Sequence, residues 1–535
     1  MIRRLSSALF GFAKRFNRWR LVLVLFLVIY AALLSFSLDY ALVQWDETQH
    51  LVSGLLLSRG ELHEYLQFSY YPPLFDITVA LTYTLIGSSL FSARLVSLIF
   101  GVLSVWAVFE YAYHLYGPKH ALLSSILLAS MPGFIVVCRM ALLETVLMFF
   151  FSISLLLFFS WMRTNNQKNL LLSGVALGLG FLAKYQTAIA GLVMFVSVLL
   201  LRKNRVKVKM GKILLLAVIA AAVILPWLFL AYNNYTSEGL ETWLYTVQAG
   251  SEERLGYGER FPLPVFYLIE MTCPYPDIHP ISLPIYALAF LGLSLWLWRR
   301  NPEDKFSLIW FVVVYVVYTL FISNRNWRYI IPVFPILAVS ASDFMLFIWN
   351  KLKTTSMPSP EIRSYKRSIR KIVAAVFVLL MAASVVYSLE NAYYWVEKDN
   401  IHIPVQEATQ YVSSNLGSNQ AAVILFAENY FSPDVVNFYL MTYDSGGKEL
   451  WYYPEYPVDV YAPVFNETYL IEQCNNLNAK YLFLYEYGDM NYFQSDWTSS
   501  DILDKTLTSE NFTLEKTFGN YPRRIFVIQF SPNYS

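Results

Sequence analysis

The stretch ALLETVLMFFFSISLLLFFSW, residues 141–161, decides the fold class of this protein. Glu144 is its only charged residue, and an α-helix of this length crosses the roughly 30 Å hydrocarbon core of a bilayer. A helix that is apolar on every side belongs in a membrane or in a large core. The stretch therefore predicts a membrane span with an ionisable side chain near one end.

Ten further apolar runs resemble this stretch, and the composition agrees with a membrane protein. The 535 residues are 56% hydrophobic and only 15% charged, whereas soluble domains carry about 25% charged residues. A soluble enzyme and a disordered chain are therefore excluded. The eleven predicted spans cover about residues 21–38, 95–115, 119–136, 141–161, 169–183, 186–201, 213–232, 281–298, 306–322, 329–349 and 371–390.

The distribution of basic residues predicts the orientation of these spans. With the N-terminus inside, the short inner segments hold 25 of the 40 Lys and Arg residues, as the positive-inside rule requires. An odd number of spans then places the tail outside. The overall balance of 40 basic against 38 acidic residues gives no reason to expect nucleic acid as a partner. We expect a multi-pass plasma-membrane protein with a cytoplasmic N-terminus and an extracytoplasmic C-terminal domain.

The chain divides into two predicted domains. Residues 1–390 form a transmembrane domain with long outer loops at 39–94 and 233–282, and residues 391–535 form a soluble domain. Runs at Ala421–Ala427, Lys480–Tyr485, Asn511–Lys516 and Arg524–Phe530 read as strands, and a helix is predicted to start at Pro433. The fold class is therefore an α-helical polytopic membrane protein with a small C-terminal α/β domain.

Two adjacent carboxylates open the first outer loop. Asp46 and Glu47 follow the first span directly, in Trp45–Asp46–Glu47–Thr48. Such a pair is costly near a membrane unless it faces water, a cation or a substrate, and a carboxylate there suits a general base. On this fragment alone, a solvated loop start explains the acids equally well.

Further charged side chains lie at the predicted outer ends of the spans. Glu144 sits just inside its span, which makes it a functional candidate, with a plain ion pair to Arg139 as the alternative. The predicted cations for a lipid phosphate at this face are Arg94, Arg139, Lys184 and Arg328. For Arg94 and Arg328 the alternative is an anchor at the membrane interface. Glycines before Lys184, including Gly174 and Gly178, allow close helix packing.

The second long outer loop leaves two questions open. Glu270, Asp277 and His279 are weak candidate ligands for a divalent metal, and a polar loop punctuated by prolines explains them as well. A disulfide between Cys273 and Cys474 is chemically allowed outside the cell. No cofactor is required by any motif.

Taken in order, these pieces resemble a known family of enzymes. The chain is similar to the polyprenol-phosphate-sugar-dependent glycosyltransferases of the C-type membrane fold, within the protein mannosyltransferase and lipid A aminoarabinose transferase superfamily. The resemblance covers about residues 20–350. It rests on Asp46–Glu47, Pro72–Pro73–Leu74, Arg94–Leu95, Arg139 to Glu144, Gly178 to Lys184, and Arg328–Tyr329 with Pro332 and Pro335.

The resemblance implies an inverting transfer of a sugar, with a mannose-like hexose favoured. The donor would be a polyprenyl or dolichyl monophosphate sugar, and the acceptor a protein, lipid or glycan. Asp46 maps onto the family's first acidic position and would act as base with Glu47 as helper, while Glu144 maps onto the second. Arg328 is the first choice for phosphate binding among the cations.

The chain departs from the family at two places. Tyr71 stands where the family often has Lys before its Pro–Pro pair, and it can still donate one hydrogen bond to a phosphate. Glu144 stands where Asp is common. Two other functions stay open: a transporter or flippase of a lipid-linked sugar, with its charges along a path through the membrane, or a non-catalytic assembly subunit.

Overall fold

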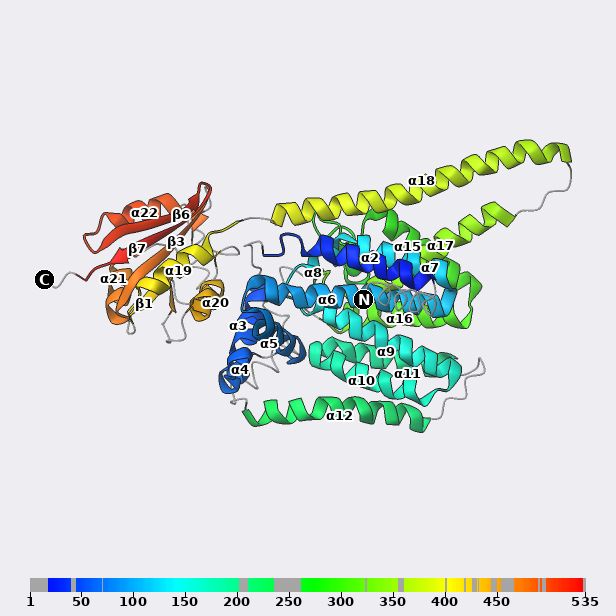
Figure 1. Cartoon of the computed structure of the whole chain (residues 1–535), viewed down its shortest axis with the longest axis horizontal. Helices are drawn as coiled ribbons and strands as arrows, with labels where there is room; N and C mark the ends of the chain where they lie inside the picture. Colours follow the sequence, from blue (N-terminus) through cyan, green and yellow to red (C-terminus); the bar gives the residue numbers. More distant parts are fainter. Residues whose placement is uncertain are drawn as a thin grey trace, which may run out of the picture. The chain divides into compact units, whose positions relative to one another are not determined.

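The structure is a computed structural model, and it divides the chain into two compact units (Figure 1). It describes residues 18–39, 45–69, 71–201, 210–234, 261–322, 325–354, 360–399, 402–417, 420–425, 431, 433–443, 450–453, 466–488, 491–492 and 497–532. The first unit comprises the described residues up to Leu38, Glu61–Thr78 and Arg94–Val396. The second comprises Asp39–Gly60, Val79–Ala93 and Glu397–Ser535.

The first unit is helical, and each of the eleven predicted spans falls on helix. The helices that correspond to the predicted spans are α2 (Arg18–Ser35), α6 (Leu90–Tyr116), α7 (Pro118–Ser130) with the short α8 (Pro132–Cys138), α9 (Glu144–Thr164), α10 (Gln167–Ala183), α11 (Ala188–Leu201), α12 (Met210–Asn234), α15 (Leu283–Arg299), α16 (Pro302–Leu320), α17 (Phe334–Thr354) and α18 (Pro360–Asp399).

The predicted count of eleven spans is not confirmed. Among the described residues, six helices are long and apolar enough to cross a membrane, or seven if the bent pair α7 and α8 forms one span. That pair bends by 72° at a break beside Pro132, because proline cannot donate the backbone hydrogen bond that would continue the helix. Helices α10, α11 and α15 are apolar but shorter than 18 residues. A multi-pass membrane protein is nevertheless confirmed.

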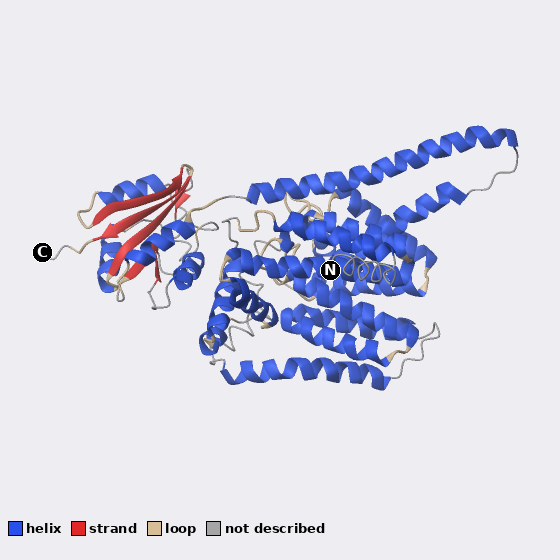
Figure 2. Ribbon diagram, in the orientation of Figure 1, coloured by secondary structure: helices blue, strands red, loops and turns tan. Residues whose placement is uncertain are grey.

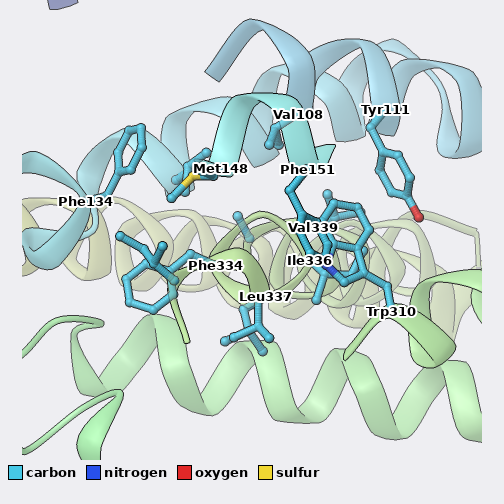
Figure 3. Close-up of a cluster of buried hydrophobic side chains, with 14 of the residues drawn as sticks. Val108, Tyr111, Phe134, Met148, Phe151, Trp310, Phe334, Ile336, Leu337 and Val339 are labelled. Carbon is cyan, nitrogen blue, oxygen red and sulfur yellow. The ribbon is translucent and has the colours of Figure 1, made fainter. Parts of the chain in front are cut away.

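Close packing of the helices depends on small residues at their contacts. A Cβ atom on Gly178 of α10 would lie 2.9 Å from the carbonyl oxygen of Ala220 on α12, and one on Gly292 of α15 would lie 2.0 Å from the carbonyl oxygen of Ser340 on α17. Only glycine permits either approach, which confirms the packing role predicted for the α10 glycines. The buried side chains between helices are large and apolar, including Phe151, Trp310 and Phe334 (Figure 3).

The second unit contains the strands of the described chain, which Figure 2 draws in red. The main sheet has the order β2-β1-β3-β7-β6, in which β1 pairs in parallel with β2 and β3, and β7 pairs antiparallel with β3 and β6. The strands are β1 (Ala421–Leu425), β2 (Leu450–Tyr453), β3 (Ala479–Tyr487), β6 (Phe512–Asn520) and β7 (Arg523–Phe530). The four predicted strands and the helix from Pro433, α20 (Pro433–Tyr443), are confirmed.

Two pieces of the N-terminal half belong to this second unit. Helix α3 (Trp45–Arg59) packs on α20, and Arg59 donates a hydrogen bond to the carbonyl oxygen of Met441. The ring of Tyr83, in α5 (Leu74–Ile86), lies 6.4 Å from the ring of Phe438 in α20. All three cysteines are free thiols in the structure, and Cys273 and Cys474, the predicted disulfide partners, belong to different units.

Candidate functional site

A buried ion pair joins the start of α9 to the end of α10. The Nζ atom of Lys184 lies 3.0 Å from Oε1 of Glu144, and both residues are less than 10% exposed. Glu144 is the first residue of α9, where the helix dipole favours a carboxylate. Lys184 ends α10 in an extended conformation that lets the chain turn into the next short helix. Sequence predicted both residues as functional, and the structure brings them together.

Two tyrosines lie near this pair, and we call the four residues the Glu144 cluster: Glu144, Lys184, Tyr318 and Tyr329. Lys184 Nζ lies 5.2 Å from the centre of the Tyr329 ring, which gives a cation–π contact. Tyr318 of α16 is fully buried, and its hydroxyl has no hydrogen-bond partner among the described residues. Glu144 and Tyr329 act electrostatically on that hydroxyl. A buried hydroxyl without a partner is costly, which suits a place that a polar ligand would complete.

Arg328 precedes Tyr329 in a turn before α17. Its backbone N–H donates to Oδ1 of Asn326 at 3.0 Å, and its side chain is half-buried. Trp327 beside it is buried against Trp395, with ring centres 5.4 Å apart. Trp327 is therefore packed into protein, while Arg328 and Tyr329 are half-buried. Near it, burial raises the pKa of Tyr267 and keeps its phenol neutral.

Arg139 and Arg94 both bind the backbone where α2 ends. Arg139 Nη1 donates to the carbonyl oxygens of Leu34 and Phe36 at 2.6 and 2.8 Å, and its Nη2 donates to that of Ser37 at 2.9 Å. Arg94 is 0% exposed and donates to the carbonyl oxygen of Leu38 at 3.1 Å. The carbonyl of Leu34 is one that the C-terminus of α2 leaves unsatisfied, and the other three lie in the turn that follows the helix. Full burial excludes an interfacial anchor for Arg94.

We expect Arg139→Ala to destabilise the protein by about 3 kcal/mol, because it removes hydrogen bonds between a charge and three carbonyls, one buried and two partly buried. The free energy of unfolding, measured by denaturant titration in detergent micelles, checks this. Arg300→Ala is the matched control, since exposed Arg300 also donates to a carbonyl, that of Leu297, and should cost under about 0.5 kcal/mol. An equal loss of unfolding free energy in both variants would contradict the proposal that Arg139 stabilises the protein by binding these carbonyls.

The Pro72–Pro73 segment positions a buried acid that sequence reasoning missed. Asp76 is 0% exposed, and its Oδ2 accepts hydrogen bonds from Tyr65 Oη at 3.2 Å and Ser69 Oγ at 3.4 Å. Tyr71 is half-buried just before the two prolines. The sequence does carry a signal that could have found Asp76. It is an acidic residue in the first turn of an apolar helix, and such a residue is itself a candidate for function.

Asp46 and Glu47 lie in the first turn of α3, in the second unit. Glu47 is 0% exposed, whereas Asp46 is half-buried. A base must reach an incoming acceptor, so the accessible Asp46 suits that task better than Glu47 does. The other predicted site residues belong to the first unit.

The predicted metal candidates do not converge. Asp277 is exposed, Glu270 is buried, and His279 Nδ1 lies 2.7 Å from the carbonyl oxygen of Thr272. Among the described residues, no group of three His, Cys, Asp or Glu side chains is arranged to hold a metal ion. The three residues therefore do not form a metal site.

Comparisons with known proteins bear on the family and the fold. Residues 71–229 match the dolichyl-phosphate-mannose-protein mannosyltransferase family. A protein of Aquifex aeolicus (strain VF5) is 25% identical over 278 residues, which are 51% of this chain. The aligned part spans about half the length, 52%, of that curated relative.

Solved structures share the fold over nearly the whole chain. ArnT from Cupriavidus metallidurans, solved both apo and bound to undecaprenyl phosphate, matches with a TM-score of 0.63 at 15% identity, covering 94% of this chain and 97% of that chain. The Archaeoglobus fulgidus oligosaccharyltransferase matches with a TM-score of 0.55 at 14% identity. The match covers 87% of this chain and 69% of that chain. The resemblance to C-type membrane glycosyltransferases is confirmed, in fold over most of the chain and in sequence over residues 71–229.

Proposed function

We propose that this protein is a membrane glycosyltransferase that moves a sugar from a polyprenyl or dolichyl monophosphate to a protein, lipid or glycan acceptor. The observation that carries the proposal is the buried Glu144–Lys184 pair beside the Tyr318 hydroxyl. A mannose-like hexose is the favoured sugar, because the matching family uses dolichyl-phosphate mannose. The related ArnT was solved with undecaprenyl phosphate and the archaeal enzyme with dolichol-phosphate, which supports a lipid-phosphate donor.

Lys184 is suited to hold the donor phosphate while it stays paired with Glu144. An ammonium group has three N–H donors, and Glu144 Oε1 takes one of them. The remaining donors and the guanidinium of half-buried Arg328 would bind phosphate oxygens. Arg94, Arg139 and Tyr71 complete the proposed phosphate-binding set, although both arginines also hold backbone carbonyls. Cations here stabilise the charge of the departing phosphate.

Asp46 is the proposed general base, with Glu47 as its helper. It would take the proton from the acceptor hydroxyl or amide while the oxygen or nitrogen of that group forms its bond to the anomeric carbon of the sugar. The bond from that carbon to the phosphate oxygen breaks at the same time, and the polyprenyl phosphate leaves. Attack from the side opposite the leaving group inverts the anomeric centre. Glu144 would act at the phosphate side by orienting Lys184.

The proposed orientation places this chemistry outside a plasma membrane. The N-terminus would be cytoplasmic, and residues 391–535 would form an extracytoplasmic domain that shapes access of the acceptor, following residues 1–390 as the transmembrane domain. The described charged residues of the Glu144 cluster lie at helix ends and not along a path through the bundle. This location favours transfer over the alternative of a transporter or flippase of a lipid-linked sugar.

A donor panel tests the function directly. Membranes that contain the protein are supplied with radiolabelled polyprenyl-phosphate hexoses and pentoses, and label is followed into protein, lipid and glycan fractions. We expect label from one donor class to enter one fraction, and membranes without the protein give the background. Label that crosses sealed vesicles without any transfer would overturn the proposal in favour of transport.

A further inference from the structure

Arg325 is a half-buried arginine that the residue assignments above do not use. It follows α16 and stands three positions before Arg328. Its Nε atom is buried and has no hydrogen-bond partner among the residues that the structure describes. A buried guanidinium N–H without an acceptor is costly, because nothing replaces the hydrogen bond that it made to water. Such a group suits a place where a ligand supplies the acceptor.

Three other cations of the proposed site differ from Arg325 in this respect. Arg94 and Arg139 donate to backbone carbonyl oxygens, and Lys184 lies 3.0 Å from Oε1 of Glu144. These contacts are made within the protein and need no ligand. The described residues offer the Nε atom of Arg325 no acceptor of this kind.

Tyr267 places Arg325 beside the Glu144 cluster, within the first unit. It lies in the short helix α14 (Phe266–Glu270), is fully buried, and has its ring centre 6.1 Å from that of Tyr318. Burial is the main cause that raises the pKa of Tyr267, Tyr329 raises it further, and the positive charge of Arg325 lowers it. The phenol of Tyr267 therefore lies within electrostatic range of Arg325 on one side and of the cluster on the other.

An anion that enters this region needs a cation besides Lys184. The Glu144–Lys184 pair is neutral as a whole, so it cannot by itself balance the negative charge of a phosphodiester taken out of water. Glu270 is buried and also acts on the Tyr267 hydroxyl, which makes a further cation more necessary there. A guanidinium meets this need well, since it is always charged and its planar fork matches two phosphate oxygens.

We propose that Arg325 is a further phosphate-binding residue of the donor site, whose guanidinium donates hydrogen bonds to the phosphate oxygens of the polyprenyl-phosphate sugar. This inference rests on the proposed function, because it names another contact of the same site. When the bond from the anomeric carbon to the phosphate oxygen breaks, its electron pair stays with that oxygen. The phosphate thereby gains a second negative charge, so a fixed cation stabilises the departing group more than the bound donor.

Lipid binding to the purified full-length protein in detergent, followed by native mass spectrometry, tests this assignment without any transfer reaction. Undecaprenyl phosphate is compared with undecaprenol, which has the same chain and no phosphate. We expect the wild type to prefer the phosphate. Arg325→Gln should weaken binding of undecaprenyl phosphate about tenfold, since it removes charge-assisted hydrogen bonds, and should leave undecaprenol binding unchanged. Arg325→Lys should recover part of the loss, because it restores the charge but not the fork.

The matched control is Arg300→Gln. Arg300 is exposed and precedes α16, so about 28 Å of helix separates it from Arg325, and its Nε already donates to the carbonyl oxygen of Leu297. This variant should bind both lipids as the wild type does. Without lipid, Arg325→Gln should also unfold at the same temperature as the wild type, because its Nε has no partner to lose among the described residues.

The possible results separate this inference from the proposed function. A wild type that binds the two lipids equally would contradict the lipid-phosphate donor, and this inference with it. A wild type that prefers the phosphate, with unchanged binding in Arg325→Gln, would overturn the role of Arg325 alone. A lower unfolding temperature of Arg325→Gln, with equal losses for both lipids, would show that Arg325 supports the fold instead of the ligand.

Discussion

Asp46→Asn will lower kcat for sugar transfer by about 10²–10⁴-fold, the usual contribution of a general base. The amide keeps the size of the side chain but cannot accept the acceptor's proton. Asp46 is half-buried in the first turn of α3, and the substitution keeps the shape of its side chain, so it should leave folding intact. Initial rates at saturating donor, in membranes with equal amounts of protein, measure the effect.

The matched control for this variant is Asp39→Asn. Asp39 is an exposed carboxylate seven residues earlier in the same predicted outer loop, and its loss should change the rate less than twofold. Glu47→Gln separates base from helper: if Asp46 is the base, Glu47→Gln should reduce the rate less than Asp46→Asn does. Full activity of Asp46→Asn with the true donor and acceptor would remove Asp46 from the mechanism, even if the protein remains a transferase.

The sequence predicted the helices well because apolar runs of membrane length carry a strong signal. Strands in the tail were also predicted, since alternating or apolar β-branched and aromatic runs bounded by turn residues mark them. The grouping of α3 and residues 79–93 with the C-terminal sheet was not predicted. Contacts such as the one between Tyr83 and Phe438 join residues more than 350 positions apart, and no local pattern encodes them.

The candidate site was predicted in its residues but not in its pairings. Sequence placed Glu144 near Arg139, five positions away, as an alternative ion pair, whereas the structure pairs Glu144 with Lys184 across two helices. Arg139, which follows α8 directly, instead binds three carbonyls at and after the end of α2, an arrangement that no local sequence pattern encodes. Tyr318 was missed, since one tyrosine in an aromatic-rich span gives no distinct signal.

Lys184→Met will destabilise the protein by about 3–5 kcal/mol, the loss expected when one member of a buried ion pair is removed. Glu144 is 3% exposed and would lose the cation that lies 3.0 Å from its Oε1 atom. The free energy of unfolding in detergent micelles measures this loss. Arg163→Met is the matched control on α9 itself, since the exposed Arg163–Glu303 pair at 3.5 Å should contribute less than about 1 kcal/mol.

The double variant Lys184→Met with Glu144→Gln separates stability from catalysis. It removes both charges, so most of the lost stability should return, as it does when buried pairs are replaced together. Transfer should not return, because no ammonium group remains to bind the donor phosphate. A double variant as unstable as Lys184→Met would show that the cost arises from packing and not from the charge of Glu144. A stable and fully active double variant would remove Lys184 from the phosphate site and leave Arg328 as the principal cation there.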